Sequence, residues 1–91
     1  MKTFISIGTG PGMGFATAER FAKEGYTVVL AARSADKVQD LAAQLSGKGL
    51  KAEAATVDTS NGASVEALIE DVRRRHGSVD VIHYNAASMR Q

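Results

Sequence analysis

Glycines are concentrated in one short loop near the N-terminus. Residues 8–14 read Gly-Thr-Gly-Pro-Gly-Met-Gly, with glycine at every second position. Such a loop lets the backbone approach a ligand closely, because glycine has no Cβ to hold the ligand away. Where the loop leads into a helix, free N–H groups of the first turn can bind a phosphate. The candidate phosphate cradle therefore consists of Gly8, Thr9, Gly10, Pro11, Gly12, Met13 and Gly14.

The spacing of these glycines distinguishes between nucleotide-binding motifs. The common dinucleotide pattern Gly-x-Gly-x-x-Gly/Ala fails in every register, because its last position never falls on a glycine or an alanine. A P-loop also fails, since no Lys-Ser or Lys-Thr follows the glycines. The pattern Gly-x-x-x-Gly-x-Gly does fit, on Gly8, Gly12 and Gly14.

A basic residue follows the second apolar segment. Arg33 comes 19 residues after Gly14, at a place where an acidic residue would bind the ribose 2'-hydroxyl of NAD. An arginine there can instead pair with the 2'-phosphate of NADP, so we favour NADP over NAD. Ser34 could add a hydroxyl to the same phosphate. The simpler alternatives are a solvated arginine at a strand end and a serine that only caps a helix.

Hydrophobic periodicity predicts the elements that position these residues. Short apolar runs predict strands at 4–7, 26–32, 50–57 and 79–84. Apolar side chains recur with helical spacing at 12–23, 34–47 and 61–76. The connections are too long for hairpins, so the strands should be parallel and the crossovers right-handed.

The order βαβαβαβ predicts an α/β fold with a doubly wound parallel sheet of the Rossmann type. Its strand order should be 3-2-1-4, with the first two helices on one face and the third on the other. Lys51 and Glu53 in the third strand are typical of a sheet edge. We expect residues 1–91 to form one dinucleotide-binding unit, a truncated version of this fold.

Polar residues follow three of the predicted strands at corresponding places. Arg33 follows the second strand, Asp58 ends the third, and Asn85 with Ala86 follows the fourth. Together with the glycine pattern, these positions resemble the short-chain dehydrogenase/reductase family. The resemblance implies that Asp58 contacts adenine and that Asn85 and Ala86 line the ribose and nicotinamide side. Asp58 could also be a simple turn residue, and Asn85 could simply end its strand.

The resemblance covers all 91 residues but corresponds only to the N-terminal part of a family member. Three positions depart from the family pattern. Ile7 stands in place of a threonine, which removes a hydroxyl that ties the loop to the strand. Tyr84 and Ala87 replace an asparagine and a glycine on either side of the turn at Asn85.

The catalytic residues of the family lie on later elements. Hydride transfer to a carbonyl needs a proton donor beside the nicotinamide, and the family uses a Ser with a Tyr-x-x-x-Lys pair. The tyrosines of this chain are Tyr26 and Tyr84, and four residues after them stand Leu30 and Ser88. We therefore expect no catalytic residue and no turnover from these 91 residues alone.

Charge and composition argue against several other classes of partner. Eleven basic and ten acidic residues give a net charge of +1, which supports neither nucleic-acid nor membrane-surface binding. The basic run at 73–76 is expected to be a solvated helix end. No apolar run approaches the length of about 20 residues that a membrane span needs. With no cysteine and an isolated His83, we expect no metal site, and cytoplasm is the default location.

The predicted fourth strand would be an apolar edge. Such an edge is a template for pairing with another chain, so we expect self-association through it or through the bare sheet face.

The leading interpretation is the NADP-binding portion of an oxidoreductase that transfers a hydride between NADP and a carbonyl or hydroxyl substrate. The alternative is a non-catalytic nucleotide-binding or self-associating Rossmann module.

Overall fold

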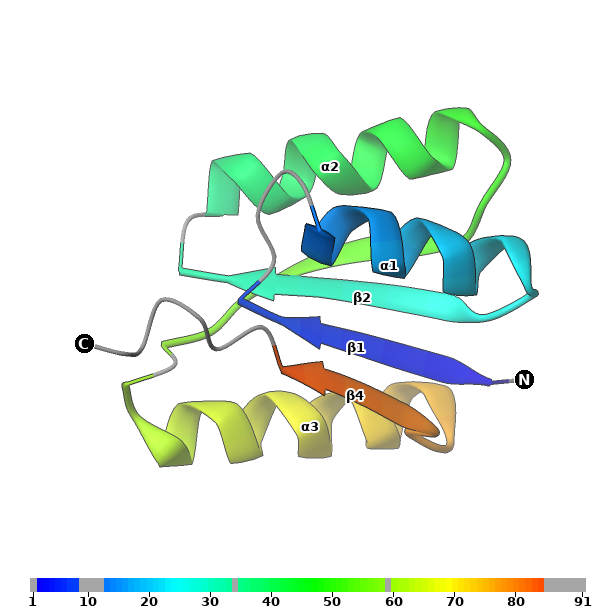
Figure 1. Cartoon of the computed structure of the whole chain (residues 1–91). Helices are drawn as coiled ribbons and strands as arrows, with labels where there is room; N and C mark the ends of the chain where they lie inside the picture. Colours follow the sequence, from blue (N-terminus) through cyan, green and yellow to red (C-terminus); the bar gives the residue numbers. More distant parts are fainter. Residues whose placement is uncertain (1, 9–12, 34, 59, 85–91) are drawn as a thin grey trace.

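Strands and helices alternate along the chain in the computed structural model, which describes residues 2–8, 13–33, 35–58 and 60–84 (Figure 1). The elements are β1 (Thr3–Ile7), α1 (Met13–Lys23), β2 (Thr27–Ala32), α2 (Ala35–Gly47), β3 (Ala52–Thr56), α3 (Gly62–His76) and β4 (Val81–Tyr84). The predicted order βαβαβαβ is confirmed.

The strands form one parallel sheet in the order β3-β2-β1-β4, as predicted. β1 lies in the middle, and all five of its residues are buried. A parallel strand covered on both faces needs apolar side chains at successive positions rather than at alternate ones. β2 meets this requirement with the run from Val28 to Ala31. In β1 the apolar residues are Phe4, Ile5 and Ile7, and Ser6 between them is a buried polar residue.

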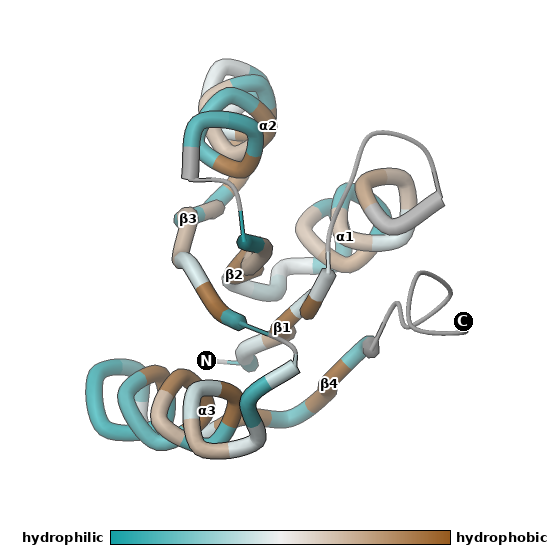
Figure 2. The backbone as a smooth tube through the Cα atoms, turned by 90° about the vertical axis from the view of Figure 1, so that its left-hand side faces the viewer, coloured by the Kyte–Doolittle hydropathy of each residue, from teal (hydrophilic) through white to brown (hydrophobic). Residues whose placement is uncertain are grey.

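The sheet separates two hydrophobic cores. Helices α1 and α2 cover one face and α3 covers the other, again as predicted (Figures 1 and 2). The buried residues of the first core are Phe4, Ala18, Ala22, Val28, Leu30, Val38, Leu41, Ala42 and Leu45. Those of the second core are Ile5, Ile7, Val29, Ala31, Val57, Leu68 and Val72. Successive residues of β1 and β2 therefore alternate between the two cores.

Both ends of α3 are capped by the residues that the sequence offers there. Asn61 is the N-cap, and its side chain accepts a hydrogen bond of 2.9 Å from the N–H of Ala63. Gly77 ends the helix with φ 90°, a left-handed conformation that side chains rarely adopt. Its N–H donates to the carbonyl of Arg73 at 2.8 Å.

β4 begins later than predicted, at Val81 rather than residue 79. The cause is Asp80, whose N–H donates to the carbonyl of Thr3 at 2.9 Å. The Asp80 carboxylate in turn accepts the N–H of Thr3 at 2.9 Å, where a strand would offer a carbonyl. A side chain thus replaces the first step of the parallel ladder.

The basic run at the end of α3 contacts the edge strand β3. Arg75 donates to Glu53 at 2.8 Å and to Asp71 at 2.9 Å, and Nε2 of His76 lies 2.8 Å from Glu53. Pairs this exposed contribute about 1 kcal/mol or less each. Their role is to fix the end of α3 beside β3.

The opposite edge of the sheet is apolar. Ile82 of β4 is 45% exposed. Among the described residues it is the only large apolar side chain that is exposed. β4 pairs with β1 on one side, and no described strand pairs with its other side. No helix in the described part of the chain is both long and apolar enough to cross a membrane.

Candidate functional site

The carboxyl ends of the four strands meet at one edge of the sheet. The N–H of Gly8 donates to Ala31 at 2.8 Å, and the N–H of Val57 donates to Ala32 at 3.0 Å. These bonds continue the ladder one residue beyond β1 and β3, so Gly8, Arg33 and Asp58 follow neighbouring strands. Ligands of open α/β sheets bind outside this edge, where the strand order reverses. Here the reversal lies between β1 and β4.

The glycine loop starts in a backbone conformation that favours glycine. Gly8 has φ 82°, which favours a residue without a Cβ. Met13 and Gly14 are the first two residues of α1, which has no acidic residue in its first turn. The positive end of the α1 dipole is therefore not neutralised by its own first-turn side chains. The remaining predicted loop residues, Thr9, Gly10, Pro11 and Gly12, lie outside the described residues.

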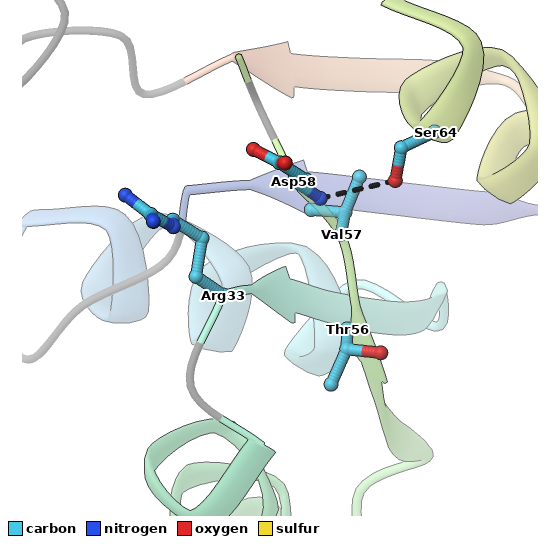
Figure 3. A pocket seen from close by; sticks show the side chains of 5 residues that line it. All are labelled: Arg33, Thr56, Val57, Asp58 and Ser64. Carbon is cyan, nitrogen blue, oxygen red and sulfur yellow. Dashed lines mark hydrogen bonds between the residues drawn. The ribbon is translucent and has the colours of Figure 1, made fainter. Parts of the chain in front are cut away.

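An open pocket of about 340 Å³ lies between the ends of β2 and β3 and the start of α3. Its lining consists of Arg33, Thr56, Val57, Asp58 and Ser64 (Figure 3). Two of the predicted site residues, Arg33 and Asp58, are thus brought together. The other predicted residues near the sheet edge, Ser34, Asn85 and Ala86, lie outside the described residues.

Asp58 is held at both its side chain and its backbone. Its Oδ1 accepts from the hydroxyl of Ser60 at 2.6 Å and from the N–H of Ser60 at 3.0 Å. Its own N–H donates to the hydroxyl of Ser64 at 3.0 Å. The bonds from Ser60, with a smaller contribution from the positive charge of Arg33, lower the pKa of Asp58. Asp58 is consequently a carboxylate at neutral pH.

Arg33 supplies a cation at the same pocket. It follows β2 directly and is exposed. Within the described part of the chain it forms no salt bridge with a carboxylate, although it attracts Asp58 at longer range. Its guanidinium thus keeps its donors for an anion, and a planar guanidinium suits a phosphate.

Four residues of this site were not predicted from the sequence. Thr56, Val57 and Ser64 line the pocket, and Ser60 binds the Asp58 carboxylate. The only available signal was the cluster of small polar residues after Asp58, which indicated helix caps but not which hydroxyl would contact which atom.

The described residues contain no group of three or more His, Cys, Asp or Glu side chains that could hold a metal ion. His83 instead packs against Phe4, with ring centroids 6.2 Å apart.

The fold defines a doubly wound α/β unit with an open pocket and a cationic side chain at the carboxyl edge of its sheet. Comparisons with known proteins identify its family. The family described as short chain dehydrogenase matches residues 2–91. Meso-2,3-butanediol dehydrogenase of Serratia marcescens is 40% identical over 85 residues, which are 93% of this chain and 33% of that protein. Short-chain dehydrogenase/reductase SDRA of Arabidopsis thaliana is 32% identical over 87 residues, 96% of this chain and 34% of that protein.

Solved structures agree. An actinorhodin polyketide ketoreductase variant with NADPH superposes with a TM-score of 0.86 at 31% identity, over 92% of this chain and 32% of that one. L-Sorbose reductase of Gluconobacter frateurii, complexed with NADPH and L-sorbose, gives a TM-score of 0.80 at 36% identity. The match covers 89% of this chain and 31% of that one.

This chain belongs to the short-chain dehydrogenase family of oxidoreductases. It spans about a third of the length of the relatives it matches.

Proposed function

We propose that this chain is the NADP-binding portion of an oxidoreductase that transfers a hydride between NADP and a carbonyl or hydroxyl substrate. The observation that carries the proposal is Arg33, an exposed guanidinium without a salt bridge among the described residues, beside a pocket lined by Asp58. The relatives solved with NADPH support the same cofactor class.

Each part of the cofactor has residues of suitable chemistry in this sequence. The loop from Gly8 to Gly14 would hold the pyrophosphate at the start of α1. Arg33 and Ser34 would bind the 2'-phosphate. The residues that would contact the rest of the cofactor are Asp58 at the adenine, and Asn85 and Ala86 beside the ribose and nicotinamide.

The described part of this site fits a phosphorylated dinucleotide. Gly8 keeps the backbone open at the end of β1, α1 has no first-turn carboxylate to repel a phosphate, and Arg33 provides a cation. When bound, the cofactor would supply a hydride in its reduced form, NADPH, or accept one in its oxidised form, NADP+. The proton donor of the family has no counterpart at Tyr26 or Tyr84. We therefore infer that these 91 residues bind the cofactor without turning over a substrate.

A second candidate, a self-associating module without catalysis, is favoured by Ile82. Its 45% exposed side chain, and the side of β4 that pairs with no strand among the described residues, would bring two copies together. We propose this contact as a property of the chain in solution, with the cytoplasm as its location.

Calorimetric titration with NADPH and NADH tests the cofactor proposal. We expect NADPH to bind at least about tenfold more tightly, because charge-assisted bonds to a phosphate each contribute about 1.5–3 kcal/mol. Failure to bind either dinucleotide, or a preference for NADH, would contradict it.

A further inference from the structure

The carboxylate of Asp58 is held on one oxygen only. Both hydrogen bonds that described residues make to it come from Ser60 and end on Oδ1. The backbone bond to Oδ1 measures 3.0 Å and the hydroxyl bond 2.6 Å. Among the described residues, none donates to Oδ2. One oxygen is therefore occupied within the turn, and the other remains available to a ligand.

The position of Asp58 is also fixed from α3. Ser64 lies in the first turn of that helix and accepts the N–H of Asp58 at 3.0 Å. Leu68 and Val72 bury α3 against the sheet, so this contact connects Asp58 to the second core. Figure 3 shows Ser64 and Asp58 joined in this way on one side of the pocket and Arg33 on the other.

The bonds from Ser60 also determine how the carboxylate can interact. The hydroxyl bond is the largest cause of the lowered pKa of Asp58, ahead of the backbone bond and the attraction of Arg33. An ionised carboxylate accepts hydrogen bonds but cannot donate them. It will therefore favour a donor on the bound base and disfavour an acceptor.

We propose that Ser60 is a positioning residue of the pocket, which occupies Oδ1 of Asp58 and so presents Oδ2 to an amino group on a purine base. Adenine carries such an amino donor at its six-membered ring, whereas hypoxanthine carries an acceptor oxygen at the same position. The pocket is thereby selective for an amino purine. This inference rests on the proposed function, since it assumes that the base of a dinucleotide lies beside Asp58.

The chain offers a matched control for Ser60 at the opposite end of the sheet. The hydroxyl of Ser78 donates to Oδ2 of Asp80 at 3.1 Å, two residues away, and Asp80 contacts Thr3 rather than the pocket. Ser78→Ala therefore removes the same kind of bond from a different aspartate. Ser60→Thr keeps a hydroxyl in place and is the rescue variant.

The first test follows the Asp58 carboxyl by NMR as a function of pH in the 91-residue chain. We expect Ser60→Ala to raise the pKa of Asp58, Ser60→Thr to keep it near that of the parent chain, and Ser78→Ala to leave it unchanged. An unchanged pKa of Asp58 in Ser60→Ala would overturn the positioning role.

The second test titrates the same variants with adenosine 2',5'-bisphosphate and with its inosine counterpart. The parent chain should prefer the adenosine probe by about tenfold, Ser60→Ala should lose most of that preference, and Ser60→Thr should restore it. If Ser60→Ala lost affinity for both probes equally, Ser60 would be a merely structural serine, and the inference would be overturned. If the parent chain binds neither probe, the proposed function fails together with base selection, while the NMR titration still decides whether Ser60 holds Asp58.

Discussion

Arg33 is the residue on which the proposed preference for NADP over NAD depends. Replacing it by Gln keeps a polar side chain but removes the charge that a 2'-phosphate requires. We expect Arg33→Gln to weaken NADPH binding by about tenfold to a hundredfold and to leave NADH binding nearly unchanged. Calorimetry measures both, and Arg74→Gln on the exposed end of α3 is the control for loss of one positive charge. Equal weakening of both dinucleotides in Arg33→Gln would contradict this role.

Arg33 and Asp58 could be found from the sequence because Arg33 directly follows β2 and Asp58 lies two residues after β3. Parallel strands bring their carboxyl ends to one edge, so position along the chain predicts proximity there. Ser60 and Ser64 could not be found in the same way. Their roles depend on the path of the turn between β3 and α3, which decides which hydroxyl reaches the carboxylate and which reaches the N–H.

Asp80 should make the free energy of unfolding depend on pH in the acid range. The N–H of Thr3 lowers the pKa of Asp80 below its ordinary value of 3.8, with a further contribution from Ser78. Because the folded pKa lies below the unfolded one, this stabilisation is complete above pH 3.8 and is lost as the pH falls through the folded pKa. Asp80→Asn keeps an acceptor for Thr3 but removes the charge. We expect it to be less stable at neutral pH and to lose less stability on acidification, measured by urea unfolding between pH 7 and pH 2. If the stability of Asp80→Asn changed with pH in the same way as that of the parent chain, this role of the Asp80 charge would be contradicted.

At the scale of the elements, α3 depends on its N-cap. The side chain of Asn61 accepts the N–H of Ala63, which has no partner inside the helix. Asn61→Ala should lower the free energy of unfolding by about 1 kcal/mol, whereas Asn61→Ser should retain most of it. Denaturant unfolding measures the difference. An alanine variant as stable as the parent chain would show that the cap contributes nothing.

The helices were predicted more closely than the edge strands, and the physical reason is visible in α3 and β4. The apolar stripe of α3 has a clear helical period, and Asn61 and Gly77 are strong end signals. The start of β4 depends instead on Asp80, which takes the N–H of Thr3 with its side chain. A contact between residues 77 positions apart has no local signal in the sequence.

At the scale of the whole molecule, the two edges of the sheet differ. Glu53 on β3 pairs with Arg75 and His76, whereas β4 exposes Ile82. Charges protect an edge from pairing with another chain, and an apolar edge invites it. The proposed self-association therefore belongs to the β4 side.

Ile82→Lys tests this contact. We expect the parent chain to elute as an oligomer at micromolar concentration and the variant to elute as a monomer, because a buried lysine at the interface would be costly. Size-exclusion chromatography with light scattering measures both, with Ala43→Lys on the exposed face of α2 as the control. A parent chain that is monomeric under these conditions would count against the contact.

In the proposed function, a dinucleotide binds at the carboxyl edge of the sheet, with its adenosine end between Arg33 and Asp58. The most direct measurement is a backbone amide NMR titration of the 91-residue chain with NADPH. We expect the largest chemical-shift changes at the amides of Gly8, Arg33 and Asp58, and unchanged shifts at the amides of Thr27 and Lys51 at the opposite edge. Shifts confined to that opposite edge, or no shifts at saturating NADPH, would contradict it.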